Sequence, residues 1–169
     1  MALSSPLLIH EAVLKPWEVS SLTTVAPSGR PGSLMTSYLN LTITDPNNHI
    51  SKAVLIPPPE GSSPTTANCS AAWPVFGTPP YDQVLNCTET PVGSWTFAML
   101  KSETPNDLWD FILRFTFARK GGATFVGSAH FYAQVNLQGT CSASGFCAFR
   151  LRDELKPFYI NQTLVKSLY

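Results

Sequence analysis

Two of the four cysteines in this chain lie inside N-glycosylation sequons, so two chemistries of the secretory pathway meet on adjacent residues. Thiols pair as disulfides in oxidising compartments, and the asparagine of Asn-X-Ser/Thr accepts N-linked glycans. Cys69 and Cys87 occupy the middle positions of two sequons. The four acceptor residues are Asn40, Asn68, Asn86 and Asn161. This combination predicts a secreted, extracellular glycoprotein. The alternative is a cytosolic chain with free thiols and accidental sequons.

The four cysteines allow three pairings. Their places on the expected strands favour two local disulfides, Cys69–Cys87 and Cys141–Cys147. The first pair flanks a Pro-rich segment of 17 residues, and Gly145 would let the chain turn inside the second. Each closed loop would contribute about 2–3 kcal/mol in the chain-entropy account. A crossed pairing would have to bring Cys141 beside Cys69 or Cys87.

A hydrolytic triad is the most specific catalytic arrangement that the residue types allow. Ser128, His130 and Tyr132 share one face of an expected strand, and Asp110 would lie across from them. A triad also needs a nucleophile within hydrogen-bond reach of its base and an oxyanion site. The chain has no Gly-X-Ser-X-Gly turn. We therefore interpret these residues as a polar strand surface.

Other catalytic and cofactor chemistries have weaker support. The nearest carboxylate pairs for glycoside hydrolysis are Asp107 with Asp110 and Asp153 with Glu154, and both pairs fall where strands end and turns begin. The cysteines and histidines lack the spacing of a metal site, and no Gly-rich phosphate loop is present. We predict a non-enzyme without a metal or cofactor.

Composition argues against nucleic-acid and membrane partners. The net charge is zero, and 13% of residues are charged, against about 25% in an average soluble protein. No apolar run approaches the roughly 18 residues that cross a bilayer. Positive charge does gather in residues 108–169, which carry seven basic and three acidic side chains. Arg150 and Arg152 could form part of a basic surface there, although a scattered distribution is the simpler interpretation.

Period-two alternation of apolar and polar residues predicts strands along most of the chain. The clearest example is residues 109–117, followed by a Gly-rich turn and a second strand that extends to Leu137. Within this expected hairpin, Gly127 and Ala129 would leave room for large side chains on the partner strand. The expected strands span residues 16–22, 37–44, 53–56, 83–88, 95–101, 109–117, 124–137, 148–151 and 159–165. We predict an all-β, single-domain antiparallel barrel or sandwich over residues 16–169, with residues 1–15 as an N-terminal extension.

Three segments have the composition of loops: residues 27–34, 57–68 and 73–80. The last is unusual because it contains two large apolar side chains, Trp73 and Phe76. They would either close one end of the core or bind a partner. Aromatic side chains also stack on sugars. The candidates for such stacking are Trp73, Phe76, Tyr81, Trp95 and Trp109.

The order of these elements resembles the Alternaria major allergen family of fungal secreted proteins. The shared order is a strand at residues 17–20, an alternating strand at residues 38–43, a local cysteine pair around a Trp-containing loop, aromatic strands, and a second local cysteine pair before a C-terminal strand. The second cysteine loop is shorter than expected. A fifth cysteine for an intermolecular disulfide is absent. The resemblance implies a compact β-barrel with two disulfides and no shared catalytic activity.

The resemblance also implies a role as an allergen, elicitor or effector during plant colonisation. We therefore expect a secreted fungal effector that binds a host extracellular protein in the plant apoplast and modulates immunity, as a monomer or a non-covalent dimer. The candidate contacts are Trp73, Phe76, Arg150 and Arg152. The alternative is a carbohydrate-binding β-domain that uses exposed aromatic side chains on cell-wall glycans.

Overall fold

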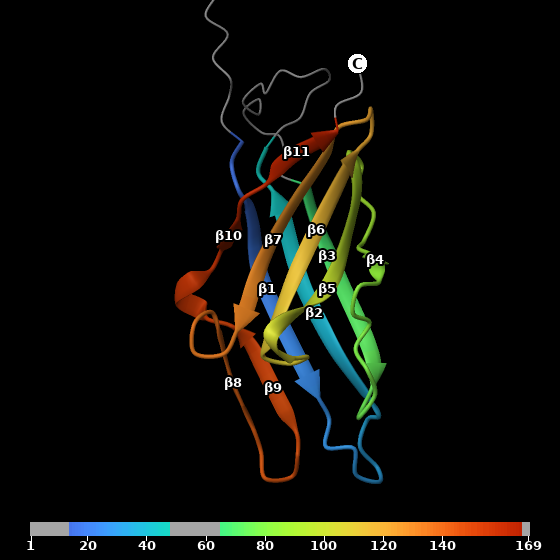
Figure 1. Ribbon diagram of the computed structural model, residues 1–169, viewed down its shortest axis with the longest axis vertical. Helices are drawn as coiled ribbons and strands as arrows, with labels where there is room; N and C mark the ends of the chain where they lie inside the picture. The colour runs from blue at the N-terminus through green and yellow to red at the C-terminus, as the bar shows by residue number, and fades with distance from the viewer. Residues whose placement is uncertain (1–13, 48–64, 167–169) are drawn as a thin grey trace, which may run out of the picture.

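The computed structural model describes residues 14–47 and 65–166 of the chain, which fold into two antiparallel sheets (Figure 1). Within these ranges there are eleven strands and one 3₁₀ turn, Asp153–Leu155. The strands are β1 (Trp17–Ala26), β2 (Thr36–Asp45), β3 (Thr65–Pro74), β4 (Val84–Asn86), β5 (Gly93–Asn106), β6 (Asp110–Arg119), β7 (Thr124–Tyr132), β8 (Leu137–Cys141), β9 (Cys147–Leu151), β10 (Phe158–Ile160) and β11 (Thr163–Lys166). The predicted all-β antiparallel fold is confirmed.

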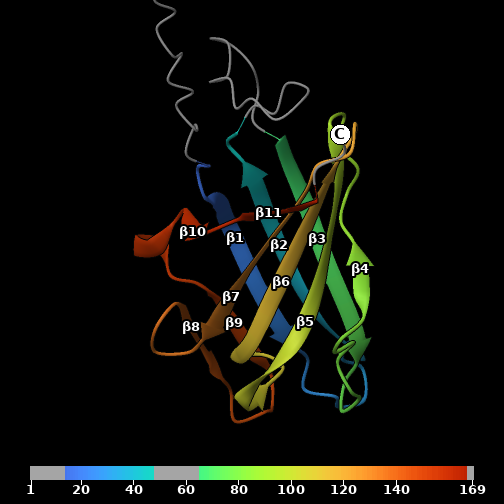
Figure 2. The same cartoon turned by 45° about the horizontal axis from the view of Figure 1, so that its top comes forward.

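The two sheets lie face to face and do not close on one another (Figure 2). The first sheet has the order β3-β2-β1-β9-β8, and β10 pairs with the beginning of β1. The second sheet has the order β11-β7-β6-β5-β4. Of the two predicted architectures, the sandwich is therefore correct. Among the described residues, no helix is long and apolar enough to span a lipid bilayer.

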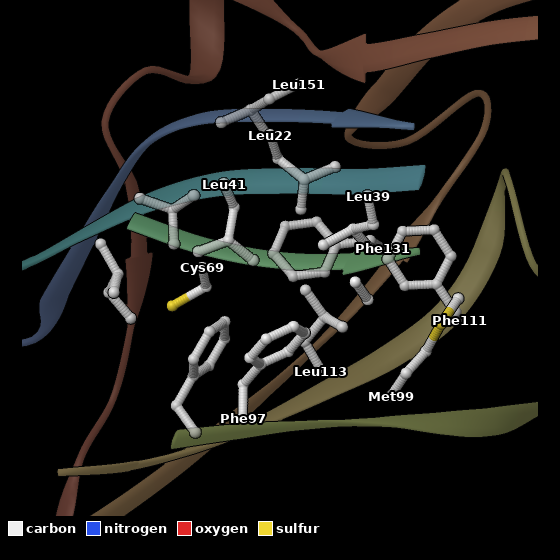
Figure 3. Packing of buried hydrophobic residues seen from close by; sticks show 14 of the residues in the cluster. Leu22, Leu39, Leu41, Cys69, Phe97, Met99, Phe111, Leu113, Phe131 and Leu151 are labelled. Atoms are coloured by element: carbon white, nitrogen blue, oxygen red, sulfur yellow. The ribbon is translucent and has the colours of Figure 1, made fainter. Parts of the chain in front are cut away.

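The core lies between the sheets, where the alternating strands bury their apolar faces. On β6, Phe111, Leu113, Phe115 and Phe117 are buried, while Arg114 on the opposite face is exposed. The side chains of β1, β2 and β3 meet those of β5, β6 and β7 in a single cluster (Figure 3). Burial of apolar area contributes about 25 cal/mol per Å². Because the two sheets share this core, its burial stabilises both of them at once.

The predicted hairpin exists as β6 and β7, with Phe115 opposite Gly127 and Leu113 opposite Ala129. The space above Gly127 is used differently from the prediction. It is occupied by the ring of Trp17 and by the chain between β10 and β11. The second strand is also shorter than predicted: β7 ends at Tyr132, and Leu137 begins β8 in the other sheet. Gln134, with a φ of 76°, lies in the turn between them.

Residues 65–74 form the edge strand β3, where the sequence predicted the ends of two loops. The strand buries Ala67, Cys69, Ala71 and Trp73 and pairs with β2 along its whole length. Three of these inward side chains are small and have weak strand preference, so the alternation was hard to recognise. The predicted strand at residues 53–56 and most of the N-terminal extension, residues 1–15, lie outside the described residues.

Both predicted local disulfides are present, Cys69–Cys87 and Cys141–Cys147. The first joins β3 to the residue after β4, and these two strands are the terminal strands of the two sheets on one side of the sandwich. On the other side, the chain itself crosses from the first sheet at β10 to the second at β11. The two sheets are thus linked by a disulfide on one side and by the chain segment between β10 and β11 on the other.

Candidate functional site

Three loops meet at the lower end of the sandwich in Figure 1: the β1–β2 loop, the turn that follows β3 and the β8–β9 hairpin tip. The backbone N–H of Val75 donates to the carbonyl oxygen of Met35 at 2.9 Å. A β-carbon built at Gly29 would meet the ring of Phe76, and one built at Gly145 would lie 3.7 Å from the carbonyl oxygen of Ser28. The turn after β3 is thus bound to the β1–β2 loop, and the β8–β9 tip lies beside that loop.

Four large apolar side chains project from this surface, and we call them the tip patch. The exposed fractions are 75% for Leu34, 56% for Met35, 87% for Phe76 and 45% for Phe146. Arg30 is the single charged residue among residues 27–36, 75–80 and 139–149. Apolar side chains in an uncharged surround are typical of the centres of protein interfaces.

The backbone at Phe76 is held in an unusual conformation. Its φ is 62°, in a left-handed region that bulky residues rarely occupy. The turn is closed by the N–H of Gly77, which donates to the carbonyl oxygen of Pro74 at 2.8 Å. Backbone strain of this kind gathers at binding sites, where the surrounding structure maintains it. Here it keeps a large aromatic ring in solvent.

Trp73, the second aromatic residue of the predicted loop, is placed differently. It lies on β3 with an exposed fraction of 4%, and its Nε1 donates to Oδ2 of Asp107 at 3.1 Å. The predicted loop position of Trp73 is therefore wrong, because the strand continues to Pro74. A partner would have to displace Asp107 to reach the indole. Trp73 closes this end of the core, and Phe76 lies outside it.

Of the tip patch, only Phe76 was among the predicted contacts. Leu34 and Met35 follow a Gly- and Pro-rich segment, and Phe146 lies between two cysteines in a stretch of small residues. The available signal was a large apolar side chain in a segment of loop composition, where no period-two alternation would place it on a strand. The sequence could not show that the three segments meet.

Arg150 and Arg152 do not form an unopposed basic surface. Arg150 pairs with Asp153 at 3.3 Å and Arg152 with Glu154 at 3.4 Å, while Lys156 reaches Asp153 at 2.8 Å. Hydrogen bonding to Lys156, followed by the charges of Arg150 and Lys156, lowers the pKa of Asp153. Arg114 lies on β6 in the other sheet. Positive charge is therefore scattered, and Arg150, Arg152 and Lys156 are each paired with Asp153 or Glu154.

The candidate triad residues form a polar cluster on the second sheet. His130 Nε2 and Asp110 Oδ1 are 2.6 Å apart, and Thr104 donates to Asp110 Oδ2 at 2.6 Å. Burial raises the pKa of Asp110, but hydrogen bonds from Ser102, Thr104 and His130 outweigh it, so the pKa lies below its ordinary value. In the described ranges, no hydrogen bond joins Ser128 to His130. Asp110 therefore orients the ring of His130.

The aromatic residues proposed for sugar stacking are mostly covered. Trp73 and Trp95 are buried, and Tyr81 and Trp109 are partly buried. Trp109 packs against Phe149 with ring centroids 5.2 Å apart, and Lys101 lies over the ring of Tyr81. Phe76 alone among the five is exposed. Of the five candidates for sugar stacking, Phe76 is thus the one that a glycan could reach without rearrangement.

All four sequon asparagines are exposed, as glycan acceptors must be. Asn40 lies on β2, Asn68 on β3, Asn86 on β4 and Asn161 between β10 and β11. In the part of the chain that the structure describes, no group of three His, Cys, Asp or Glu side chains is arranged to hold a metal ion.

No protein-family model matches this chain, and neither a curated protein nor a solved structure is significantly similar to it. The resemblance to the Alternaria major allergen family therefore stays a prediction. The two disulfides indicate an extracellular or secreted protein.

Proposed function

We propose that this chain is a secreted, non-catalytic protein that binds an extracellular protein partner through the tip patch. The observation that carries the proposal is the exposure of Phe76, a residue that is 87% accessible on a turn with a positive φ, next to loops in which Arg30 is the single charged residue. In keeping with the element order of fungal secreted proteins, we further propose a host protein of the plant apoplast as the partner and modulation of host immunity as the outcome.

The tip patch has the physical properties of a protein-binding centre. Aromatic anchors contribute most of the binding energy at many interfaces, and truncating one costs 2 kcal/mol or more. Phe146 lies within the short loop closed by the Cys141–Cys147 disulfide, and Phe76 lies in a hydrogen-bonded turn. Because the backbone at both residues is already constrained, ordering these loops on binding costs little conformational entropy.

The test is an affinity capture of the oxidised protein from plant apoplastic fluid, read by mass spectrometry. Wild type is compared with Phe76→Gly, which suits the positive φ and removes the ring. Tyr159→Ala is the matched control, because Tyr159 is an aromatic residue on β10 with 58% exposure, outside the tip patch. We expect one dominant partner that Phe76→Gly loses and Tyr159→Ala retains. Equal capture by all three proteins would contradict the proposed surface.

Arg150 is proposed as a contact at the rim of the same interface. It is exposed on β9, four residues after Phe146, and its ion pair with Asp153 lies at the surface. A rim charge changes the association rate and its salt dependence more than it changes the dissociation rate. Arg150→Glu should therefore slow association with the captured partner. Arg152, whose side chain is 31% exposed against 59% for Arg150, should have a smaller effect on the same rate.

Carbohydrate binding is distinguished by isothermal titration calorimetry of the protein with chitin, cellulose and xylan fragments. The indoles of Trp73 and Trp95 are buried, so tryptophan fluorescence would not report a sugar at the tip patch, whereas the heat of binding would. We expect no saturable heat change with any glycan. A saturable change would favour the carbohydrate-binding alternative over the protein partner.

A further inference from the structure

Three of the four sequons lie side by side across β2, β3 and the end of β4. Antiparallel pairing of β2 with β3 places Asn40 opposite Ser70 and Thr42 opposite Asn68. The acceptor asparagine of each sequon thus faces the hydroxyl residue of the other. The Thr42 hydroxyl donates to Oδ1 of Asn68 at 2.8 Å.

The third sequon continues this pattern on the other side of β3. The Cys69–Cys87 disulfide joins the middle residues of two sequons, with their Cα atoms 4.2 Å apart. The backbone N–H of Asn68 donates to Oγ1 of Thr88 at 2.9 Å, and the N–H of Thr88 donates to the carbonyl oxygen of Asn68 at 2.8 Å. Asn68 is therefore held between the hydroxyl residues of both neighbouring sequons.

The surface is hollowed at the same place. An open depression of about 350 Å³ lies here, and every residue that lines it except Ser21 belongs to one of the three sequons. The side chains that line it are mainly hydroxyls and amides. Ser21 extends the hydrogen-bonded row, since its Oγ donates to Oγ1 of Thr42 at 3.1 Å.

We propose that Asn40, Asn68 and Asn86 form one N-glycosylation patch, in which glycan occupancy of Asn68 and Asn86 is decided by a race with closure of the Cys69–Cys87 disulfide. The donor is a lipid-pyrophosphate-linked oligosaccharide. The asparagine amide nitrogen attacks its anomeric carbon, a C–N bond forms, the carbon–oxygen bond to the pyrophosphate breaks, and the lipid pyrophosphate leaves. The proton released by the amide passes to a base. In the competing step, the two thiols pass two electrons and two protons to the disulfide of an oxidant.

The folded arrangement makes the two reactions compete. In an extended strand, an asparagine and the hydroxyl residue two positions later are about 6.6 Å apart along the chain. A transferase that recognises the two together needs a chain that it can bend. Once the disulfide closes, Asn68 is fixed in hydrogen bonds with Thr42 and Thr88. Asn86, next to Cys87, is drawn to the same edge.

The patch also has a structural consequence. Strand β3 ends the first sheet and β4 ends the second, and open edges of this kind invite pairing with other chains. Glycans on Asn68 and Asn86 would cover this edge, whereas the tip patch at the end of the sandwich would stay free for its partner. The inference depends on the proposed entry into the secretory pathway and is independent of the partner.

The test is cell-free translation of the full chain, fused to a cleavable signal peptide, with microsomal membranes and with or without dithiothreitol. Peptide mass spectrometry gives occupancy at each asparagine in the total membrane fraction, so poorly folded chains are counted too. We expect dithiothreitol to raise occupancy at Asn68 and Asn86, roughly doubling it, because reduced thiols cannot close the loop. Asn161, remote from the disulfide, should be unchanged.

Two pairs of substitutions separate the disulfide from general effects of the reductant. Cys69→Ala with Cys87→Ala should raise occupancy at Asn68 and Asn86 without dithiothreitol. Cys141→Ala with Cys147→Ala, which removes the other disulfide, should leave occupancy at both sites unchanged. Occupancy at Asn68 and Asn86 that responds to neither dithiothreitol nor the first pair would overturn the race. An absence of glycan at all three asparagines would overturn the patch. Because the signal peptide is supplied, neither result depends on partner binding.

Discussion

The ring of Phe76 lies directly over Gly29, so the turn after β3 is supported by the β1–β2 loop. Gly29 has a φ of 69°, which glycine adopts at no steric cost. A β-carbon at this position would also clash with the ring. Glycine is therefore required twice at position 29, for the backbone and for the aromatic ring that it supports.

Substituting Gly29 should destabilise the fold and move the tip patch. We expect Gly29→Ala to lower the free energy of unfolding by about 1–3 kcal/mol, through backbone strain and displacement of Phe76. Gly32→Ala is the matched control, since Gly32 also has a positive φ but has open space at its β-carbon. Urea denaturation of both variants measures the difference. Equal losses would mean that the Phe76 contact has no energetic weight.

Gly127 should not tolerate a side chain. A β-carbon there would press on the carbonyl oxygen of Asn161 and the ring of Trp17, where the chain crosses between the sheets. We expect Gly127→Ala to cost about 1–3 kcal/mol, as overpacking does in other cores. The neighbouring Ser128→Ala, on the exposed face of β7, should stay within about 0.5 kcal/mol of wild type. Thermal unfolding of the two variants checks this, and an unaffected Gly127→Ala would show that the crossing segment yields.

Asp110 should make stability depend on acidic pH. Because its folded pKa lies below the ordinary value of 3.8, its contribution is complete above pH 3.8 and is lost as the pH falls through the folded pKa. We expect Asp110→Asn to cost about 1–3 kcal/mol near pH 6, because the amide cannot accept hydrogen bonds at both atoms. Denaturant unfolding at several pH values should show the two stability curves converging in acid. A constant difference down to pH 2 would contradict this assignment.

The two disulfides should differ in their effect on stability. The Cys69–Cys87 bridge spans 18 positions and Cys141–Cys147 spans six. Chain entropy assigns them about 3 and about 2 kcal/mol respectively. The first also links strands at the ends of different sheets, whereas the second lies within one hairpin. We expect urea denaturation to show a larger loss for Cys69→Ala with Cys87→Ala than for the other pair, and the reverse order would contradict the linking role.

Long alternating segments were the part of the fold that sequence predicted best. On β6, every second residue from Phe111 to Phe117 is large and apolar, and this pattern alone predicts the buried face and the hairpin with β7. Strand β3 was missed because Ala67, Cys69 and Ala71 carry little of that signal. Its position as a strand depends on pairing with β2, which residue types in a single segment do not reveal.

The candidate site was also predicted only in part from the sequence. The exposure of Phe76 and the burial of Trp73 could not be separated from sequence, because the two residues lie three apart in a segment that reads as a loop. The sequence by itself predicted most of the strands and both local cysteine pairs, and it contains the four sequons, since these features depend on residue types at short spacing. Tertiary structure alone decided that three loops meet at one end and that three sequons align across neighbouring strands. Both follow from register between segments far apart in the chain, which is fixed only when the two sheets bury their apolar faces together.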